Sequence, residues 1–403
     1  MRLLFYSHDS YGLGHIRRTL GITQRLLKDF PQASALVLTG APRAHLLDYP
    51  ARCDYVKLPS VTKSFNGQYT SREIALTLDQ TVALRSRLIA DAADSFQPDV
   101  FLVDHTPTGL CGEIRSVIQA APSTSIRPVR ILGMRDIIDE PAAVRAAWRR
   151  DHVLQCLRDC YDLIWIYGQR SLFDPISAYG IPDDVAAKMV FAGYLPRNGA
   201  AIPPEAVRRQ FAPRSGRLVA VTVGGGGDGN RPLRSFLAGY RSLGSAPPFE
   251  VLLVTGPLMS PRKRAALRDQ AGGLPGATVI DFHPDVPALY RAADFVIAMA
   301  GYNSVCELAC AGSRALLIPR TSPRKEQLVR AQLLSQAGLT RYLTAEQATP
   351  QALIEATLEG LELPPPPRRW GLDFSGLNNI SRALAKVMTA HPRRALTCLR
   401  AVS

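Results

Sequence analysis

The stretch SHDSYGLGHIRRTLGI, residues 7–22, places a histidine in a loop between a strand and a helix. The run before it is apolar, as in a buried parallel strand, and apolar residues recur at helical spacing after it. Gly12 and Gly14 match the start of a dinucleotide-binding loop, but Arg17 stands where that motif has its third glycine. His15 therefore follows a strand end, where ligands bind in open α/β sheets, and its imidazole could exchange a proton near neutral pH. The alternative is a helix-entry residue with only a local hydrogen bond.

A carboxylate and a second imidazole follow another buried run. In QPDVFLVDHTPTG, Asp104 and His105 come at the end of an apolar segment. Because the carboxyl ends of parallel strands meet at one edge of a sheet, we expect Asp104 to face the same crevice as His15. There it could orient the imidazole and stabilise its protonated form, as the aspartate does in the hydrolase triad.

A glycine-rich loop opens the second half of the chain. In LVAVTVGGGGDGNRPL, Gly224 to Gly227 follow a strand-like run and precede a helix. A backbone without side chains lets a ligand approach closely, and the free N–H groups of the next helix favour phosphate. The spacing is not that of a nucleoside triphosphatase loop. A tight turn without a ligand is the alternative.

The segment from 281 to 339 contains further polar residues at predicted strand ends. A buried strand, DFVIAM, leads through AGYNS into a helix that Asn303 and Ser304 could cap. We expect Glu307 in the first turn of that helix, either as a structural carboxylate or as the acceptor of two ribose hydroxyls. Glu326 and Gln327 follow the next strand, where they could bind sugar hydroxyls or form a solvated helix start.

The length and pattern predict two α/β domains. The chain has 403 residues, of which 46% are hydrophobic and 20% charged, and strand-like runs alternate with helical segments in both halves. We expect two doubly wound Rossmann-like domains facing a cleft. The predicted boundaries are an N-terminal domain at 1–197, a linker at 198–215, a C-terminal domain at 216–370, and a C-terminal helix at 371–403 that packs back on the first domain.

The net charge of +14 favours anionic partners. The basic residues are scattered and no aromatic-interleaved motif occurs, so we do not expect nucleic-acid binding. A phosphate-bearing substrate, an acidic carrier protein or an anionic membrane surface would each suit the charge. No apolar run is long enough to span a bilayer and no signal peptide is evident, which predicts a cytoplasmic protein, with a peripheral position at the inner membrane surface compatible with the charge. The seven cysteines contain no C-x-x-C pair and imply neither a metal nor a disulfide framework.

Taken together, the residues of 281–339 resemble the nucleotide-binding domain of the GT-B glycosyltransferases. The likeness is greatest to the bacterial family that adds N-acetylglucosamine to lipid-linked muramyl pentapeptide, glycosyltransferase family 28. The matching positions are Asp285, Leu289, Tyr290, Ala292, Ala293, Asp294, Gly301, Ser304, Glu307, Ala311, Gly312, Pro319, Glu326, Gln327 and Ala331.

The resemblance implies that 1–197 is an acceptor-binding domain and 216–370 a nucleotide-sugar-binding domain, with a UDP-sugar as donor. Glu307 would bind the ribose, Glu326 and Gln327 the hexose, most directly N-acetylglucosamine. The diphosphate would lie on the glycine loop and Ser304, with the base near Phe282. The implied donor-binding residues are Gly225, Gly226, Gly227, Phe282, His283, Gly301, Asn303, Ser304, Glu307, Arg324, Glu326 and Gln327.

The resemblance also implies an inverting transfer, in which a general base removes the proton of the attacking hydroxyl. His15 with Asp104 is similar to the histidine–aspartate dyad of plant secondary-metabolite glycosyltransferases, and an imidazole with a pKa of about 6.5 suits the role. Asp9 or His105 could act instead, or Asp104 could only contact the acceptor. The expected acceptor-binding residues are Asp9, Gly14, Arg17, His105 and Arg135.

No metal is expected to assist the leaving group. The chain has no D-x-D carboxylate pair in a suitable loop, and the glycine loop, the Ser304 helix and Arg17, Arg320 or Arg324 could take up the developing phosphate charge. The acceptor stays open between a lipid-linked intermediate, a small natural product and a carrier-bound molecule. Two rival functions share these features: a UDP-N-acetylglucosamine 2-epimerase, and a non-catalytic nucleotide-sugar or RNA-binding protein.

Overall fold

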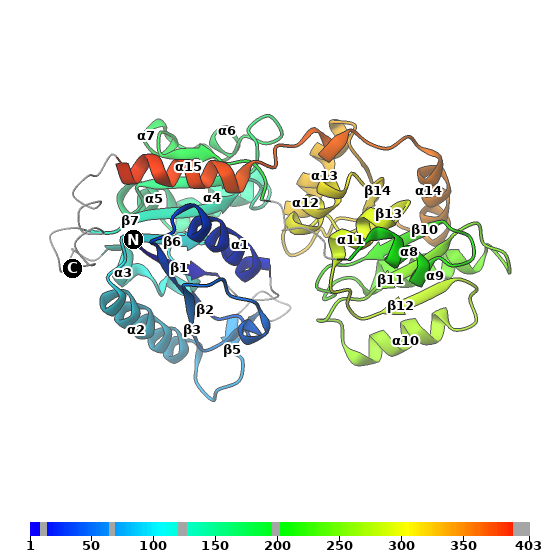
Figure 1. Cartoon of the computed structure of the whole chain (residues 1–403), viewed down its shortest axis with the longest axis horizontal. Helices are drawn as coiled ribbons and strands as arrows, with labels where there is room; N and C mark the ends of the chain where they lie inside the picture. Colours follow the sequence, from blue (N-terminus) through cyan, green and yellow to red (C-terminus); the bar gives the residue numbers. More distant parts are fainter. Residues whose placement is uncertain (9–13, 64–68, 120–126, 196–201, 390–403) are drawn as a thin grey trace. The chain divides into compact units, whose positions relative to one another are not determined.

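The computed structural model describes residues 1–8, 14–63, 69–119, 127–195 and 202–389. Within these ranges the chain forms two compact units (Figure 1). Unit 1 consists of Met1–Asp136, Pro141–Leu195 and the segment from Ser375 onward, and unit 2 consists of Ile137–Glu140 and the segment that ends at Phe374. Each unit is a parallel sheet flanked by helices, which is the predicted fold class.

Unit 1 is built on a seven-stranded sheet in the order β3-β2-β1-β6-β7-β8-β9, with every neighbouring pair parallel. The strand order reverses at β1, which pairs with both β2 and β6, so the carboxyl ends of β1 and β6 lie side by side. The strands are β1 (Arg2–Ser7), β2 (Ser34–Thr39), β3 (Cys53–Lys57), β6 (Val100–Asp104), β7 (Val129–Arg135), β8 (Leu163–Tyr167) and β9 (Met189–Phe191). All seven correspond to predicted strand-like runs, whereas the small hairpin of β4 (Val61–Lys63) and β5 (Tyr69–Ser71) was not predicted.

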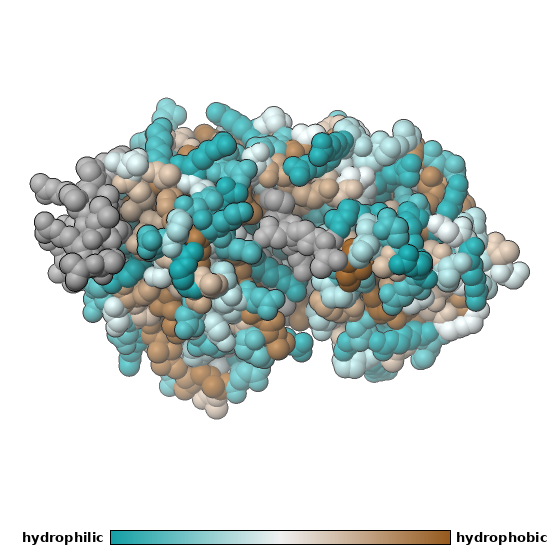
Figure 2. Space-filling view, in the orientation of Figure 1, coloured by the Kyte–Doolittle hydropathy of each residue, from teal (hydrophilic) through white to brown (hydrophobic). Residues whose placement is uncertain are grey.

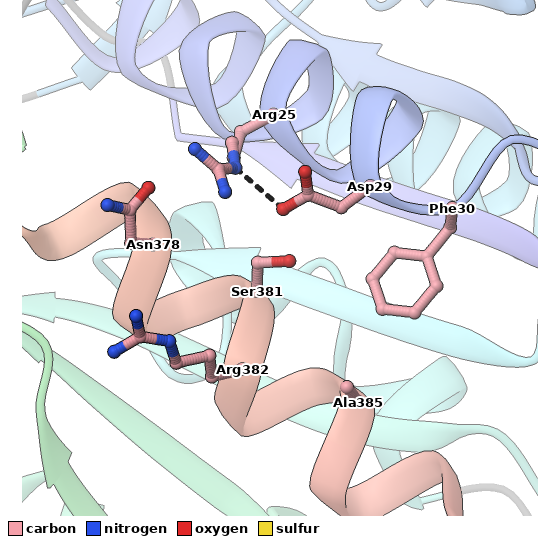
Figure 3. Close-up of a pocket in the computed structure, with 7 residues that line it drawn as sticks. All are labelled: Arg25, Asp29, Phe30, Asn378, Ser381, Arg382 and Ala385. Carbon is pink, nitrogen blue, oxygen red and sulfur yellow. Dashed lines mark hydrogen bonds and ion pairs between the residues drawn. The ribbon is translucent and has the colours of Figure 1, made fainter.

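The last helix of the chain belongs to unit 1 and packs against the first (Figure 1). A pocket of about 320 Å³ lies between them, and the ion pair of Arg25 with Asp29, 2.6 Å apart, faces Ser381 and Arg382 across it (Figure 3). The helices are α1 (Gly14–Asp29), α2 (Leu78–Phe96), α3 (Arg115–Gln119), α4 (Pro141–Arg150), α5 (Val153–Cys160), α6 (Pro175–Tyr179), α7 (Asp183–Ala186) and α15 (Gly376–Thr389), with 3-10 turns η1 (Ala44–Leu46) and η2 (Leu110–Gly112).

Unit 2 has a six-stranded parallel sheet in the order β12-β11-β10-β13-β14-β15. Its strand order also reverses at the first strand in sequence, β10, which pairs with β11 and β13. The strands are β10 (Leu218–Thr222), β11 (Glu250–Val254), β12 (Ala277–Ile280), β13 (Phe295–Ala298), β14 (Ala315–Leu317) and β15 (Arg341–Tyr342). The short β15 was not predicted.

The helices of unit 2 cover its sheet and include one inside the stretch expected to be a linker. That helix, α8, packs against α11, and Arg208 on it forms an ion pair with Asp294 at 2.9 Å. The helices are α8 (Pro204–Phe211), α9 (Asn230–Arg241), α10 (Pro261–Ala271), α11 (Val286–Ala292), α12 (Tyr302–Ala311), α13 (Glu326–Gln336) and α14 (Pro350–Glu362), with the 3-10 turn η3 (Arg368–Gly371). In the described ranges, no helix combines the length and apolar character needed to cross a bilayer.

A charged pair is sealed inside unit 1. The guanidinium of Arg85 donates from Nε and Nη2 to the two carboxylate oxygens of Glu113, each at 2.6 Å, and both side chains have no solvent exposure. Tyr6 donates its hydroxyl to the same carboxylate at 2.6 Å, and a Cβ atom at Gly40 would collide with the guanidinium. The pair thus joins α2, β1 and the segment before α3.

We predict that Arg85→Met lowers the free energy of unfolding by about 3–5 kcal/mol, because it leaves the Glu113 charge buried without its counter-ion. Urea unfolding followed by tryptophan fluorescence measures this loss. The double variant Arg85→Met/Glu113→Leu should recover most of it, since both charges are then gone. The exposed pair of Arg127 with Asp162 is the matched control, and Arg127→Ala should change stability by no more than about 1 kcal/mol. An equal effect of the two single variants would contradict the role given to burial.

Candidate functional site

His15 and Asp104 meet at the carboxyl edge of the unit 1 sheet. Asp104 is the last residue of β6, and His15 lies in the first turn of α1, the helix that follows β1. His15 Nδ1 lies 2.6 Å from Asp104 Oδ2. The carboxylate is 2% exposed and the imidazole 18% exposed, so the ring is the part of the pair that a ligand can reach.

Arg18 is a third member of this cluster that the sequence analysis missed. It donates to Asp104 Oδ1 from Nε at 2.9 Å and from Nη2 at 2.8 Å, and Nη2 also lies 2.9 Å from Oδ2. Its guanidinium stacks over the ring of Tyr167 on β8, 5.4 Å from the ring centre. The available signal was spacing, since residues three apart share a helix face and Arg18 follows His15 by three.

The partners assign the proton on the imidazole. An ionised carboxylate only accepts hydrogen bonds, so His15 Nδ1 carries the proton and donates it to Asp104. The Nη2 group of Arg18 lies 2.8 Å from the same nitrogen but cannot donate a hydrogen bond to it, because that nitrogen already carries a proton. Nε2 is left with a lone pair, which is the state that a general base requires.

Burial and charge push the two pKa values down. Burial lowers the pKa of His15 to about 4; Asp104 opposes this shift, while the charges of Arg18 and Arg135 add to it. Burial alone would raise the pKa of Asp104, but Arg18 and then His15 bring it down to about 2. At neutral pH the imidazole is therefore neutral and the carboxylate ionised. The expected pKa near 6.5 for His15 was wrong, because the ring is buried and lies beside two cations.

Two more imidazoles surround His15. His8, directly after β1, and His105, directly after β6, have ring centres 5.5 Å and 5.1 Å from that of His15. Burial lowers the pKa of His105 well below its usual range, and the charge of Arg135 adds to this effect. Arg135, the last residue of β7, places Nη2 3.4 Å from His105 Nε2. His8 was not singled out from the sequence, although its position directly after the first strand could have indicated a site residue.

Two of the other predicted acceptor-binding residues lie at the same edge of the sheet. Gly14 and Arg17 are in the first turn of α1 and are partly buried, and Asp9 lies outside the described residues. Among the residues that the structure describes, no three His, Cys, Asp or Glu side chains are arranged to hold a metal ion.

In unit 2, the glycine loop follows β10 and has two kinds of glycine. Gly224, Gly225 and Gly227 are exposed, and Gly224 has a φ of 58° that disfavours other residues. Gly226 is buried, and a Cβ atom there would collide with the backbone of Thr255 in the loop after β11. Of the predicted donor-binding glycines, Gly226 is thus required for loop packing, while Gly225 and Gly227 present backbone to solvent.

Helix α12 begins two or three residues earlier than a cap at Asn303 or Ser304 predicted. Gly301 is the N-cap and no side chain caps the helix, so Asn303 and Ser304 are not caps but lie inside the first turn. Glu307 consequently lies in the second turn, not the first. Ser304 still faces the glycine loop, with Oγ 3.9 Å from where a Cβ atom of Gly224 would lie. Burial raises the pKa of Tyr290, and the nearby charge of Glu307 adds to this shift.

The hexose-binding candidates are buried at the start of α13. Glu326 and Gln327 are 7% and 8% exposed, so the alternative of a solvated helix start was wrong. Both interact with Arg320, which follows β14: Nη2 of Arg320 donates to Glu326 Oε1 at 2.7 Å, and its backbone N–H donates to Gln327 Oε1 at 3.2 Å. Arg324 lies in the loop before α13 and is partly exposed.

The candidates for the base site differ in exposure. Phe282 is 49% exposed, as expected of a side chain on which a base could stack. His283 is buried, and its Nδ1 accepts a hydrogen bond from the backbone N–H of Asp285 at 3.1 Å. His283 thus orders the start of α11 rather than presenting a polar edge.

We predict that His15 stays neutral at pH 7 and takes up a proton only near pH 4. Nuclear magnetic resonance titration of the imidazole carbon, with labelled histidine, measures this pKa. Removing a neighbouring cation favours the imidazolium, so Arg18→Gln should raise the pKa; removing the carboxylate with Asp104→Asn should lower it. Titration of wild-type His15 near 6.5 would contradict the burial described for the ring.

Part of the chain is similar in sequence to a known family of glycosyltransferases. Residues 220–367 match the glycosyltransferase family 28 C-terminal domain. A relative from Halorhodospira halophila, UDP-N-acetylglucosamine--N-acetylmuramyl-(pentapeptide) pyrophosphoryl-undecaprenol N-acetylglucosamine transferase, is 33% identical over 170 residues, which are 41% of this chain and 45% of the relative. The chain spans less than half the length of the curated relatives it matches.

Solved structures cover almost the whole chain. The MurG structure from Acinetobacter baumannii has a TM-score of 0.59 and 15% identity, covering 96% of this chain and 99% of that one. A putative UDP-N-acetylglucosamine 2-epimerase from Listeria monocytogenes has a TM-score of 0.62 and 13% identity, covering 98% and 97%. At these identities the likeness concerns the fold. Residues 220–367 are therefore similar to the C-terminal domain of glycosyltransferase family 28, and the chain has the fold of the GT-B glycosyltransferases.

Proposed function

We propose that this protein is an inverting glycosyltransferase that moves a hexose, with N-acetylglucosamine as the expected sugar, from a UDP-sugar to an acceptor hydroxyl. The observation that carries the proposal is the hydrogen bond between His15 and Asp104, 2.6 Å long, with the imidazole partly exposed and the carboxylate buried. This arrangement supports proton abstraction. A binding protein has no need of an exposed basic nitrogen oriented by a buried charge.

In the proposed reaction, His15 Nε2 accepts the acceptor's hydroxyl proton as its oxygen bonds to the anomeric carbon. The bond from that carbon to the diphosphate breaks, and UDP leaves with the electron pair. Asp104 keeps the ring in the tautomer that leaves Nε2 free and stabilises the imidazolium. Arg18 holds the carboxylate in place through three contacts of 2.8–2.9 Å.

Unit 2 would hold the donor. The family 28 match spans 220–367 and therefore contains all of the predicted donor-binding residues. Glu307 would accept hydrogen bonds from the ribose and Glu326 with Gln327 from the hexose. The exposed backbone of the glycine loop and the N-terminus of α12 would stabilise the diphosphate, so that no metal is needed.

The acceptor is proposed from chemistry and from the names of the relatives. Those names specify a muramyl pentapeptide on pyrophosphoryl-undecaprenol, so a lipid-linked acceptor at the inner membrane surface is the first candidate. Large apolar side chains are exposed on unit 1 at Leu46, Ile74 and Leu84. Figure 2 shows apolar residues gathered over the part of unit 1 that carries β5. A small natural product or a carrier-bound acceptor would fit the same chemistry.

The first test separates transfer from epimerisation. With UDP-N-acetylglucosamine and the lipid-linked muramyl pentapeptide, we expect UDP release only when the acceptor is present, and at an unchanged rate in EDTA, because backbone groups and helix ends neutralise the leaving group. A coupled UDP assay measures both. Acceptor-independent formation of the 2-epimer would favour the epimerase. Loss of activity in EDTA with recovery on adding magnesium would refute metal independence.

The second test concerns the base. His15→Ala should lower kcat by about 10²- to 10⁴-fold, the usual scale for loss of a general base. UDP-sugar affinity, measured by calorimetry, should stay nearly unchanged because the donor residues lie in unit 2. Since the neutral ring is the active form, wild-type kcat/KM should fall as the pH drops through about 4, and His15→Ala should lack that limb.

Asp104→Asn tests the His15–Asp104 pair through its carboxylate. It should reduce kcat in the same direction as His15→Ala, and the double variant should be far less impaired than the product of the two effects, since the residues act together. Near-normal turnover by His15→Ala would exclude His15 as the base and direct attention to His105 or Asp9.

A further inference from the structure

Arg320 links the glycine loop of unit 2 to the start of α13. Its Nη1 lies 3.1 Å from Asp228 Oδ2 in the loop after β10, and its Nη2 donates to Glu326 Oε1 at 2.7 Å. The backbone N–H of Arg320 donates to Gln327 Oε1. One residue therefore fixes both hexose-binding candidates relative to the loop expected to carry the diphosphate.

The charges around Arg320 argue against a role as counter-ion for phosphate. Burial lowers the pKa of Arg320, but Glu326 and Asp228 outweigh this and raise it, so the guanidinium stays charged. One guanidinium between two carboxylates leaves a net charge of about −1 on the three side chains. The sequence-based expectation that Arg320 takes up phosphate charge is therefore disfavoured.

The Arg320–Glu326 pair leaves two buried polar atoms unsatisfied. Glu326 is 7% exposed, and neither its Oε2 nor Nε of Arg320 has a hydrogen-bond partner among the described residues. Burying an acceptor without a partner is costly, which points to a ligand group that completes the pair. A hydroxyl can donate to the carboxylate and accept from the guanidinium, whereas a carboxylate on the ligand could only accept.

We propose that Arg320 is a positioning residue that holds Glu326 so that Oε2 receives a hydroxyl of the donor's hexose, and that this pair selects an uncharged hexose over a uronic acid. The inference rests on the proposed function, because it takes unit 2 to bind a UDP-sugar. Beyond that function, the inference names Arg320 as the residue that positions the hexose site and states that the hexose bound there is uncharged.

Calorimetry with UDP, UDP-N-acetylglucosamine and UDP-glucuronic acid on the full chain tests this role. Wild type should bind UDP-N-acetylglucosamine at least about 10-fold more tightly than UDP-glucuronic acid. Arg320→Ala should weaken UDP-N-acetylglucosamine by about 10- to 100-fold and change UDP by no more than about 2-fold, because only the hexose contact is lost. Arg320→Lys should restore part of the affinity, since a lysine keeps the charge but not the fork.

Two further variants make the test specific. Glu307→Ala, the proposed ribose contact, should weaken UDP and UDP-N-acetylglucosamine equally. Asp228→Asn removes the contact of Arg320 with Asp228. It should weaken the binding of UDP-N-acetylglucosamine only, and by less than Arg320→Ala does. If Arg320→Ala does not fold, the Asp228→Asn variant decides between the outcomes.

Four results would overturn the inference. Equal weakening of UDP and UDP-N-acetylglucosamine by Arg320→Ala would make Arg320 a phosphate ligand, and no weakening of either would make it a structural residue. Equal wild-type affinity for the two UDP-sugars would remove the selection by charge. If wild type binds no UDP at all, the proposed function fails and this inference with it, whereas binding that is insensitive to Arg320 overturns the inference alone.

Discussion

The carboxyl edge of the unit 1 sheet depends on one buried charge, the carboxylate of Asp104 at the end of β6. An ionised carboxylate that is 2% exposed is stable only with close, well-oriented partners. Arg18 supplies the countercharge and His15 a further donor, both from the first turns of α1. The requirement to satisfy this carboxylate therefore fixes where α1 begins and how the imidazole faces, and Gly133 on β7 leaves the space in which Tyr167 lies beneath Arg18.

Unit 2 also holds a charged group between partners of opposite sign, but there the central group is a cation. There a cation, Arg320, lies between two carboxylates that come from a loop and a helix start. In unit 1 the charged groups lie at the ends of β1 and β6, where the strand order reverses and an open parallel sheet leaves room for a ligand. In unit 2, Asp228 follows β10, the strand at which the order reverses, while Arg320 and Glu326 follow β14. The two edges differ in chemistry: unit 1 presents imidazoles that can move a proton, and unit 2 presents backbone and oxygen atoms that can hold a nucleotide and a sugar.

The strands could be predicted because parallel strands buried on both faces have uninterrupted apolar sequences. The runs ending at Ser7, Asp104 and Thr222 were read correctly for this reason. Short edge elements such as β15, with two residues, lack such a signal. Helix α8 was taken for part of a linker because the stretch that contains it is rich in Pro, Gly and Ala, although two residues of the helix are buried.

The site was predictable in its residue types but not in its contacts. His15 and Asp104 were found because each lies at or shortly after the end of an apolar, strand-like run in the sequence. Arg18 was missed because its role depends on the side chain turning back over the strand end, which spacing only hints at. The caps of α12 were misplaced because Gly301 competes with Asn303 and Ser304, and only the backbone decides between them.

The strength of the contact between Arg18 and Asp104 limits what His15 can do as a base. A carboxylate already neutralised by a guanidinium stabilises an imidazolium less, and the pKa of about 4 for His15 reflects this together with burial. So weak a base cannot ionise a free hydroxyl ahead of the reaction. The proton can move only as the new bond to the sugar forms and makes the hydroxyl acidic. In the proposed transfer, bond formation at the anomeric carbon must therefore run ahead of proton transfer to His15. Departure of UDP from unit 2 would then control when His15 becomes protonated.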